Sequence, residues 1–327
     1  MINVLITTVP FGANNNFPLE LLETAGVNYL INPLNRKLTE VELINMVSDV
    51  DIIIAGTEPI TEKVMENAQK LKMISRVGIG LDSVDLMAAE KRGITVCYTP
   101  NAPSPAVAEL TIGLLINLLR SVQKSNYDIH SGEWNRYFGK RIAETTIGLI
   151  GLGRIGSRVL NRLAVFGTPR LLVNDILPNP ELDHNFKLEW VDKATIYKEA
   201  DVISLHVPLT KATNNMITGK ELQLMKSDAV VINTSRGGII NEEDLYNVMK
   251  SGHLSGAAID VFKEEPYNGN LSKIDRCILT AHMGSMSIDC RTRMEIEATE
   301  EVVKFINNKP LKNIVPSEEY DVQRQGL

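Results

Sequence analysis

Residues 146–156 read TIGLIGLGRIG, an apolar run that ends in three glycines with the spacing G-x-G-x-x-G. The residues that follow, SRVLNRLAVFG, have the spacing of an amphipathic helix. In such a unit Gly151 makes the tight turn, Gly153 lets the backbone approach a pyrophosphate, and Gly156 lets helix and strand pack closely. The pyrophosphate would lie on free N–H groups at the helix N-terminus. Taken alone, the motif also fits an ordinary strand-to-helix turn.

An acidic residue at the end of the next apolar run favours a dinucleotide-binding loop over an ordinary turn. The run RLLVND finishes on Asp175, about 20 residues past the glycines, where a carboxylate binds the ribose 2′-hydroxyl of a dinucleotide. The two features together predict a dinucleotide site. Because a carboxylate repels a 2′-phosphate, Asp175 favours NAD over NADP.

Short apolar runs alternate with helical patterns along nearly the whole chain, the first helical patterns being Pro18 to Ala25 and Thr61 to Gln69. Runs of 4–8 residues that are apolar on both faces indicate parallel sheets covered by helices. The alternation predicts an α/β fold with doubly wound parallel sheets. The expected strands are INVLITTV, VDIIIAG, KMISRVG and ITVCYT in the first hundred residues, and TTIGLIGLG, PRLLVND, ADVISLHVP, AVVINTS, LSGAAIDVF and CILTAH after them.

The order of these runs predicts two domains, as the length of 327 residues also does. Three prolines between Thr99 and Pro105 disfavour regular structure at the join. A long helix is expected from Val107 to Asn126. A second, from Ile288 to Asn307, is expected to return to the first domain, whereas the polar residues Ser317 to Leu327 are expected to be poorly ordered. The predicted domains are residues 1–99 with 283–327, for the substrate, and residues 100–282, for the cofactor.

The composition excludes some other classes of protein. Apolar residues make up 44% and charged residues 23%, which is ordinary for a globular protein. The net charge of −6 argues against a nucleic-acid surface. No basic region precedes the first apolar run, and the run at Ile112 to Leu119 is shorter than the ~20 residues of a membrane span. We therefore expect a cytoplasmic protein with no nucleic-acid or membrane partner.

The three cysteines, Cys97, Cys277 and Cys290, are odd in number and lack the spacing of metal ligands. This pattern predicts reduced thiols, with neither a disulfide framework nor a metal site.

Polar residues after three of the later runs suggest hydride-transfer chemistry. A 2-hydroxy acid needs a base for its hydroxyl proton and a cation for its carboxylate. His282 follows a predicted strand, so it is expected at the carboxyl edge of the sheet, although a buried structural histidine is the alternative. Arg236, at the end of another run, offers a planar fork to a carboxylate, and the alternative is a surface residue. The pattern does not choose between Glu264 and Glu265 as a carboxylate partner.

Six motifs follow one another along the chain: RVGIGLDSVDL (76–86), GLGRIG (151–156), SLHVPLT (204–210), NTSRGGIINEEDL (233–245), AAIDVFKEEP (257–266) and TAHMGS (280–285). In this order they resemble the motifs of the D-isomer-specific 2-hydroxyacid dehydrogenases, and the resemblance runs from about Ile52 to Lys304. Within that family, the resemblance is greatest to the 3-phosphoglycerate dehydrogenases.

The resemblance implies a Rossmann NAD domain inserted in a flavodoxin-like substrate domain, with NAD (NADH) as cofactor. It makes His282 the acid/base and pairs it with Glu265, the glutamate directly before Pro266. A carboxylate partner favours imidazolium, which helps His282 donate a proton when a keto acid is reduced. Arg236 would bind the substrate carboxylate and polarise the 2-oxo group.

Further contacts follow from the same resemblance. Asp260 would hold the nicotinamide carboxamide, with a buried structural role as the alternative. The implied cofactor contacts are Gly151, Gly153, Arg154, Ile155, Gly156, Asp175, His206, Pro208, Thr234, Ser235, Asp260, Gly284 and Ser285. The implied substrate contacts are Arg76, Val77, Gly78, Ile79, Gly80, Arg236 and His282.

The chain departs from the family in its substrate domain. Phosphoglycerate dehydrogenases commonly carry a phosphate-binding Arg after the second apolar strand, where this chain has Ala55. Arg76 is a substitute phosphate partner or an ordinary strand-end charge. The region of Trp134 is expected to form the arm of a homodimer, and the altered lead-in GKRIAETTIG suggests a changed arm geometry. A chain that stops at residue 327 is not expected to have serine feedback through a regulatory extension.

The leading hypothesis is an NAD-dependent D-2-hydroxyacid dehydrogenase that acts on a small-molecule acid. The candidate substrates include 3-phosphoglycerate and other acids that bear a phosphate or a phosphonate. Hydroxypyruvate or glyoxylate reductase is the alternative within the class. An NAD(H)-sensing, corepressor-like binding protein is the alternative from another class. Because Arg236, Glu265 and His282 are all present, a protein without catalysis has little support. L-specific dehydrogenases are disfavoured because their glycine loop lies near the N-terminus.

Overall fold

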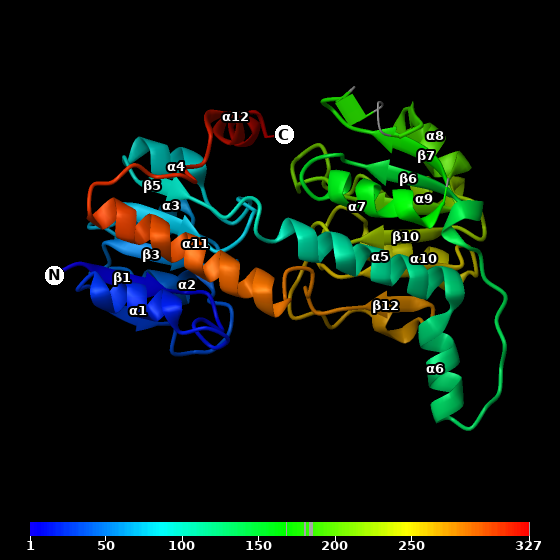
Figure 1. Ribbon diagram of the computed structural model, residues 1–327, viewed down its shortest axis with the longest axis horizontal. Coiled ribbons are helices and arrows are strands. Elements are labelled where there is room, and N and C mark those ends of the chain that lie inside the picture. Colours follow the sequence, from blue (N-terminus) through cyan, green and yellow to red (C-terminus); the bar gives the residue numbers. More distant parts are fainter. Residues whose placement is uncertain (168, 180, 183–185, 327) are drawn as a thin grey trace. The chain divides into compact units, whose positions relative to one another are not determined.

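Two parallel β-sheets organise the chain, one in each of two units (Figure 1). The computed structural model describes residues 1–167, 169–179, 181–182 and 186–326. Unit 1 consists of Met1–Pro103 and Met286–Leu327, and unit 2 of Ser104–Ser285. The chain thus passes from unit 1 into unit 2 and back, four residues after the first predicted domain boundary and three residues after the second.

Unit 1 has a five-stranded sheet in the flavodoxin-like order β2-β1-β3-β4-β5. Its helices cover both faces: α1 and α11 pack on each other and on one face, while α2, α3 and α4 line the other. The strands are β1 (Asn3–Ile6), β2 (Asn28–Ile31), β3 (Ile52–Ala55), β4 (Met73–Arg76) and β5 (Thr95–Cys97). The helices are α1 (Phe17–Thr24), α2 (Glu40–Ile44), α3 (Glu62–Asn67), α4 (Leu86–Lys91) and α11 (Ile288–Ile306).

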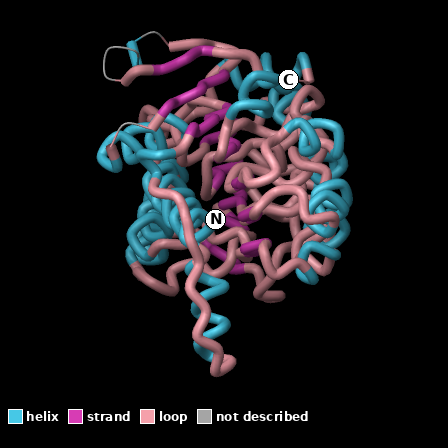
Figure 2. The backbone as a smooth tube through the Cα atoms, turned by 90° about the vertical axis from the view of Figure 1, so that its right-hand side faces the viewer, coloured by secondary structure: helices cyan, strands magenta, loops and turns pink. Residues whose placement is uncertain are grey.

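Unit 2 has a seven-stranded parallel sheet in the order β12-β11-β10-β9-β6-β7-β8, which is the Rossmann arrangement with one further strand. In Figure 2 its strands form a twisted layer with helices on either side. The strands are β6 (Thr146–Ile150), β7 (Arg170–Asn174), β8 (Leu188–Trp190), β9 (Val202–Leu205), β10 (Val230–Asn233), β11 (Gly256–Ile259) and β12 (Cys277–Leu279). The helices are α5 (Ser104–Arg120), α6 (Val122–His130), α7 (Gly156–Leu163), α8 (Lys193–Glu199), α9 (Gly219–Leu224) and α10 (Glu242–Lys250). The predicted two-domain α/β fold is confirmed.

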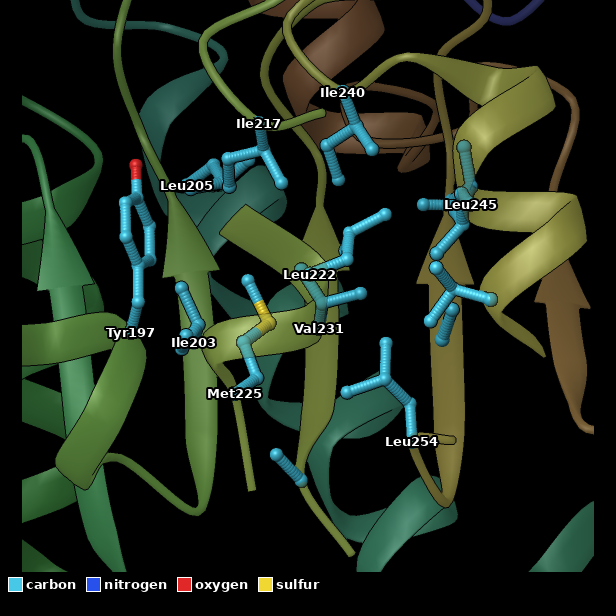
Figure 3. Close-up of a cluster of buried hydrophobic side chains, with 14 of the residues drawn as sticks. Tyr197, Ile203, Leu205, Ile217, Leu222, Met225, Val231, Ile240, Leu245 and Leu254 are labelled. Atoms are coloured by element: carbon cyan, nitrogen blue, oxygen red, sulfur yellow. The ribbon is translucent and has the colours of Figure 1, made fainter. Parts of the chain in front are cut away.

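The strands of unit 2 are apolar on both faces because both faces are covered. In β10, Val231 packs into the cluster beneath α8, α9 and α10, whereas Val230 and Ile232 pack into the cluster with α5 and α7. Figure 3 shows the first cluster, in which Ile203 and Val231 of the strands meet side chains from the helices. This alternation with a period of two produces the continuous apolar runs of the sequence.

Each sheet has one point at which the strand order reverses. In unit 1 it lies between β1 and β3, and in unit 2 between β6 and β9. In open α/β sheets, ligands bind at the carboxyl ends of the strands on either side of this point. The glycine loop follows β6, so the predicted cofactor site of unit 2 lies at its reversal point.

The prediction of one long helix at 107–126 is wrong in both its start and its continuity. It begins at Ser104, because Pro105 in a first turn needs no backbone N–H. It ends at Arg120, since Ser121 takes a left-handed conformation with φ 51°, and α6 continues at 65° to α5. No single helix among the described residues is long and apolar enough to cross a membrane; the bent pair of α5 and α6 passes that test by length and composition only.

Two strands and one helix were not expected from the sequence. Strands β2 and β8 are short, and their residues are half-buried or exposed, so they lack a long apolar run. The tail expected to be poorly ordered contains α12 (Ser317–Gln325), which packs on α4. Its Gln323 accepts a hydrogen bond from the Leu86 N–H and donates one to the Val84 carbonyl. These tertiary contacts hold a helix that has no buried apolar face of its own.

The three cysteines are free and buried. Burial raises the pKa of Cys97 and of Cys277 to about 12, so these thiols are protonated at neutral pH.

Candidate active site

The glycine loop joins β6 to α7 at the reversal point of unit 2. Gly151 has a φ of 95°, which favours glycine, and a Cβ there would lie 2.6 Å from the His206 carbonyl oxygen. A Cβ at Gly156 would lie 2.0 Å from the Gly151 carbonyl oxygen, so the first turn of α7 packs directly on the end of the strand. Only glycines fit these two positions without a shift of the backbone.

The surface of the loop fits a pyrophosphate. Apart from its chain neighbours, no described residue comes within 4 Å of a Cβ built on Gly153, so the backbone there is open to an approaching group. The first N–H groups of α7 have no partners within their own helix and carry the positive end of its dipole. Arg154 beside them is exposed, and Ile155 packs against the core. Open backbone, the positive end of the helix dipole and a neighbouring cation suit an anionic cofactor.

Asp175 follows the last residue of β7 and lies against the same loop. Its Oδ2 accepts a hydrogen bond of 2.6 Å from the Leu152 N–H, and its Oδ1 accepts one of 2.9 Å from the Leu177 N–H. The carboxylate is therefore held beside the glycines and can accept further hydrogen bonds from ribose hydroxyls. Ile176 and Leu177 after it are exposed and apolar, as a base-binding edge requires.

His206 lies on the other side of the reversal point, after β9. Burial lowers the pKa of His206 to about 4, so the ring is neutral at physiological pH. Its Nε2 lies 2.9 Å from the Ser204 hydroxyl, while its Nδ1 makes no hydrogen bond with any residue described in the structure. A buried nitrogen of this kind can accept or donate one hydrogen bond to a bound ligand. Pro208, two residues on, is exposed.

The residues after β10 are held by local hydrogen bonds. Thr234 is buried and its hydroxyl lies 2.8 Å from that of Thr111 on α5. Ser235 donates from both its N–H and its hydroxyl to Asn233 Oδ1. Arg236 is half-buried; its Nη1 donates to the Ser235 carbonyl, and its own carbonyl accepts from Asn233 Nδ2.

Gly237, which sequence reasoning did not single out, lets this turn approach the one that carries Glu265. A Cβ at Gly237 would lie 2.0 Å from the Phe262 carbonyl carbon and 2.4 Å from the Lys263 nitrogen. The glycine directly after Arg236 was the available signal in the sequence. Its reason, contact with a second turn, is a tertiary one.

His282 and Glu265 face each other across the carboxyl edge of the sheet. His282 Nδ1 lies 3.0 Å from Glu265 Oε2 and 3.1 Å from Oε1. The Phe262 N–H donates to the same Oε1, which orients the carboxylate. The His282 side chain is 37% exposed and its Nε2 forms no hydrogen bond within the described residues, so this nitrogen is accessible to a ligand. The backbone of His282 is left-handed with φ 52°, and its N–H donates to the Asp260 carbonyl.

Asp260 organises the turn that carries His282. The carboxylate is buried, and its oxygens accept hydrogen bonds from the Thr280 hydroxyl and the N–H groups of Met283 and Gly284, at 2.6–2.8 Å. Burial raises the pKa of Asp260, and these hydrogen bonds oppose the rise. The structural role that the sequence left open is thus present, although two acceptor oxygens can serve a further donor. Ser285, next to this turn, is half-buried.

In unit 1, the loop from Arg76 to Gly80 follows β4. Arg76 is 5% exposed and its Nη1 donates to the Val77 carbonyl, so it is not an ordinary surface charge at a strand end. Gly78, with φ 143°, packs on this guanidinium, and its N–H donates to the Thr99 hydroxyl. The N–H groups of Ile79 and Gly80 make no hydrogen bond within the described residues, and these two residues are half-buried. They are the N–H groups that this loop can offer to a carboxylate.

Ala55 is fully buried in the hydrophobic core of unit 1, with Ile53 and Ile74. A cation at this position would enter the core, so Ala55 is compatible with the packing of this chain and contributes no charge.

The segment from α6 to residue 141 extends away from the rest of unit 2 (Figure 1). Asp128, buried on α6, accepts hydrogen bonds from Lys124, Asn135 and Tyr137, which hold the returning chain against the helix. This arm exposes large apolar side chains: Val122, Tyr127, Ile129, Trp134, Tyr137 and Phe138.

Comparisons with known proteins agree on one family. A sequence profile described as the NAD binding domain of D-isomer specific 2-hydroxyacid dehydrogenases matches residues 112–284. D-3-phosphoglycerate dehydrogenase of Methanocaldococcus jannaschii is 37% identical over 85% of this chain and 54% of that protein. Hydroxypyruvate reductase of Thermotoga maritima is 35% identical, over 80% of this chain and 87% of that protein. Glyoxylate reductase of Thermococcus litoralis is 36% identical, over 84% and 86%. The chain thus spans about half of the first relative and most of the other two.

Solved structures are similar over almost the whole chain. A protein of Thermus thermophilus matches with a TM-score of 0.87 and 31% identity, covering 96% of this chain and all of that one. D-lactate dehydrogenase from Aquifex aeolicus, solved with NAD and lactic acid, matches with a TM-score of 0.84 and 27% identity, covering 96% and 99%.

Proposed function

We infer the reaction of this protein from its family, because the chain belongs to the D-isomer-specific 2-hydroxyacid dehydrogenases. It is an NAD-dependent oxidoreductase that interconverts a 2-hydroxy acid and its 2-keto acid, and its cofactor is NAD(H). When bound, NADH supplies the hydride for reduction of the keto acid. The observation that carries the assignment of residues is the 3.0 Å contact between His282 and Glu265 beside the turn of Arg236.

His282 acts as the acid/base in this proposal. Its Nε2 donates a proton to the 2-oxo oxygen during reduction and takes it back during oxidation. Glu265 accepts the Nδ1–H, which selects the tautomer and fixes the orientation of the ring. Asp260 keeps the turn of His282 in place through three hydrogen bonds.

The substrate carboxylate is bound by Arg236 of unit 2 in this proposal. Within unit 1, the N–H groups of Ile79 and Gly80, which make no hydrogen bond with any described residue, are further donors of the kind that a carboxylate accepts from. A guanidinium offers two parallel hydrogen bonds to a carboxylate and leaves its charge close to the neighbouring 2-oxo group. That charge stabilises the negative charge that develops on the oxygen. Asp175 binds the ribose hydroxyls of the cofactor, and the glycine loop holds its pyrophosphate.

Two groups of acids are candidates for the substrate: acids that bear a phosphate, and short acids without one. The M. jannaschii relative is named for a phosphate-bearing substrate, whereas the T. maritima and T. litoralis relatives are named for hydroxypyruvate and glyoxylate. All of these acids carry a carboxylate next to a carbon with an oxo or a hydroxyl group, and the proposed residues act on these two groups.

NADH oxidation with a panel of 2-keto acids tests the function. The panel contains hydroxypyruvate, glyoxylate, pyruvate, 3-phosphohydroxypyruvate and phosphonopyruvate. We expect turnover with at least one of them. With every acid except glyoxylate, whose product glycolate is achiral, we expect a D-2-hydroxy acid as the product on chiral chromatography. No turnover above the enzyme-free rate with any acid, or an L-product, would refute the proposal.

We further propose that the arm of unit 2 binds a second copy of this chain. Exposed apolar side chains are rarely gathered on the surface of a monomer, and those of the arm include Trp134 at 80% exposure and Phe138 fully exposed. Asp128 keeps the arm in one conformation, which lowers the entropy lost on association.

Replacing Trp134 and Phe138 together by glutamate is expected to convert a dimer into a monomer, because two charges would be buried without partners. Light scattering coupled to size exclusion measures the mass. The matched control is Val165→Glu, since Val165 lies in unit 2 outside the arm and is 81% exposed. This substitution is expected to leave the mass unchanged. A wild-type monomer, or a double variant that stays dimeric, contradicts this assignment.

A further inference from the structure

The reversal point of unit 1 lies between β1 and β3, where the general rule for open α/β sheets places a ligand. The loops that follow these strands begin with Thr7 and with Gly56. They lie at the same edge as the loop of Ile79 and Gly80, since Ala55 at the end of β3 pairs with Arg76 at the end of β4. A substrate held by that loop at its carboxylate has this reversal point beside it.

A buried carboxylate occupies this position. Glu58 is 1% exposed, and its Oε1 accepts hydrogen bonds from the Gly56 N–H at 2.9 Å and from the Thr7 hydroxyl. Within the part of the chain that the structure describes, Glu58 forms no ion pair. Its hydrogen bonds therefore satisfy the oxygen without neutralising the charge.

Gly56 allows the two loops to meet at this carboxylate. A Cβ at Gly56 would lie 2.7 Å from Glu58 Oε2 and 3.1 Å from Thr8 Cα. A side chain at position 56 would collide with the Glu58 carboxylate and with Thr8, so glycine is the residue that leaves Glu58 its place at the reversal point.

One cation at the same edge is paired with an acid. Arg291 of α11 donates from Nε to Glu295 Oε1 at 2.6 Å, and from Nη2 to Thr8 Oγ1 and the Pro10 carbonyl, so its charge is paired. Glu295 is itself 2% exposed. With Arg76 as the second cation and Glu58 as the second acid, these four buried groups sum to a formal charge of zero. A phosphate dianion needs an excess of positive charge, which this edge does not supply.

We propose that Glu58 is a specificity-determining residue that disfavours substrates with a phosphate or other anionic tail and admits tails that are uncharged. Together with the absence of a cation at Ala55, it directs the enzyme toward short neutral-tailed keto acids such as hydroxypyruvate. The inference rests on the proposed function. It concerns the group on the substrate carbon that follows the 2-oxo carbon, and it leaves the roles of His282 and Arg236 unchanged.

The test is the ratio of kcat/KM for 3-phosphohydroxypyruvate to kcat/KM for hydroxypyruvate. Wild type is expected to prefer hydroxypyruvate. Glu58→Gln keeps an oxygen that accepts from Gly56 and Thr7 but removes the charge, so the ratio is expected to rise at least about tenfold. Thr7→Val is the matched control, because it removes a hydrogen bond and keeps the charge. Its efficiency with both acids is expected to fall together, with a ratio within about twofold of wild type.

Each outcome decides a separate point. A ratio in Glu58→Gln equal to that of wild type, or a wild type that prefers the phosphorylated acid, overturns the inference while the proposed function stands. An enzyme with no turnover on any 2-keto acid overturns the proposed function instead. If thermal unfolding shows that Glu58→Gln does not fold, the double variant Thr7→Val/Glu58→Leu gives the same readout, since it replaces both partners of the buried hydrogen bond by apolar groups.

Discussion

Replacing His282 by alanine is expected to lower turnover by about 10³-fold or more, because the 2-oxo oxygen then has no proton donor. NADH affinity is expected to change little, since the glycine loop and Asp175 lie on other strand ends of the same sheet. Steady-state NADH oxidation and fluorescence titration with NADH measure the two quantities separately. A variant that turns over within tenfold of wild type would remove His282 from its role.

The left-handed backbone of His282 requires a second variant. Because asparagine adopts φ values near 52° more readily than alanine does, His282→Asn preserves the turn while removing the imidazole. The same loss of turnover in both variants assigns the effect to the imidazole. The control is His253→Ala, since His253 lies before β11 at the amino edge of the sheet, where its Nε2 contacts the Leu222 carbonyl. The NADH oxidation of this variant is expected to match that of wild type.

Gly156→Ala is expected to abolish measurable NADH binding. Its Cβ would lie 2.0 Å from the Gly151 carbonyl oxygen, so α7 must move away from the strand and carry its N–H groups with it. Overpacking of this kind costs about 1–3 kcal/mol of stability. NADH titration and thermal unfolding with and without NADH measure the two effects, and the stabilisation by NADH is expected to disappear.

The matched control for this substitution is Gly113→Ala on α5, where the new Cβ would meet no described atom within 4 Å outside its own helix turn. Alanine in an exposed helix interior is expected to stabilise the protein by up to about 1 kcal/mol and to leave NADH binding unchanged. An equal NADH affinity in Gly156→Ala and Gly113→Ala would show that close packing of the loop is not needed for the cofactor.

Much of the cofactor side of the site could be predicted from local sequence. The glycines and Asp175 belong to one strand–helix–strand unit, formed by β6, α7 and β7. The geometry of such a unit depends mainly on the conformation of neighbouring residues in the chain. The pairing of His282 with Glu265 is different. The two residues are 17 positions apart on separate turns, and adjacent glutamates at 264 and 265 made the pattern ambiguous. The resemblance to a family selected Glu265, and the structure brings its carboxylate to the imidazole.

The substrate side was much less predictable. The sequence left two roles open for Arg76, a phosphate partner or an ordinary strand-end charge, and it has Ala55 where a phosphate-binding Arg was expected. In the folded chain Arg76 is buried against Gly78, and Ala55 lies inside the hydrophobic core. Glu58 drew no attention in the sequence, because a glutamate in a polar loop is ordinarily solvated. Burial and the lack of an ion pair are properties of its surroundings, which no local pattern encodes.

The sequence by itself determined the class of fold, the insertion of one unit in the other and the position of the glycine loop, because hydrophobic periodicity and glycine spacing act over a few residues. The tertiary structure decided which turns meet: the Gly237 turn on Phe262, Asp260 on the turn of His282, and Glu58 between the loops of unit 1. Contacts of this kind join residues from different strand ends, and their strength depends on burial and on the charges around them. For that reason the class of reaction could be predicted from the sequence, whereas the substrate could not.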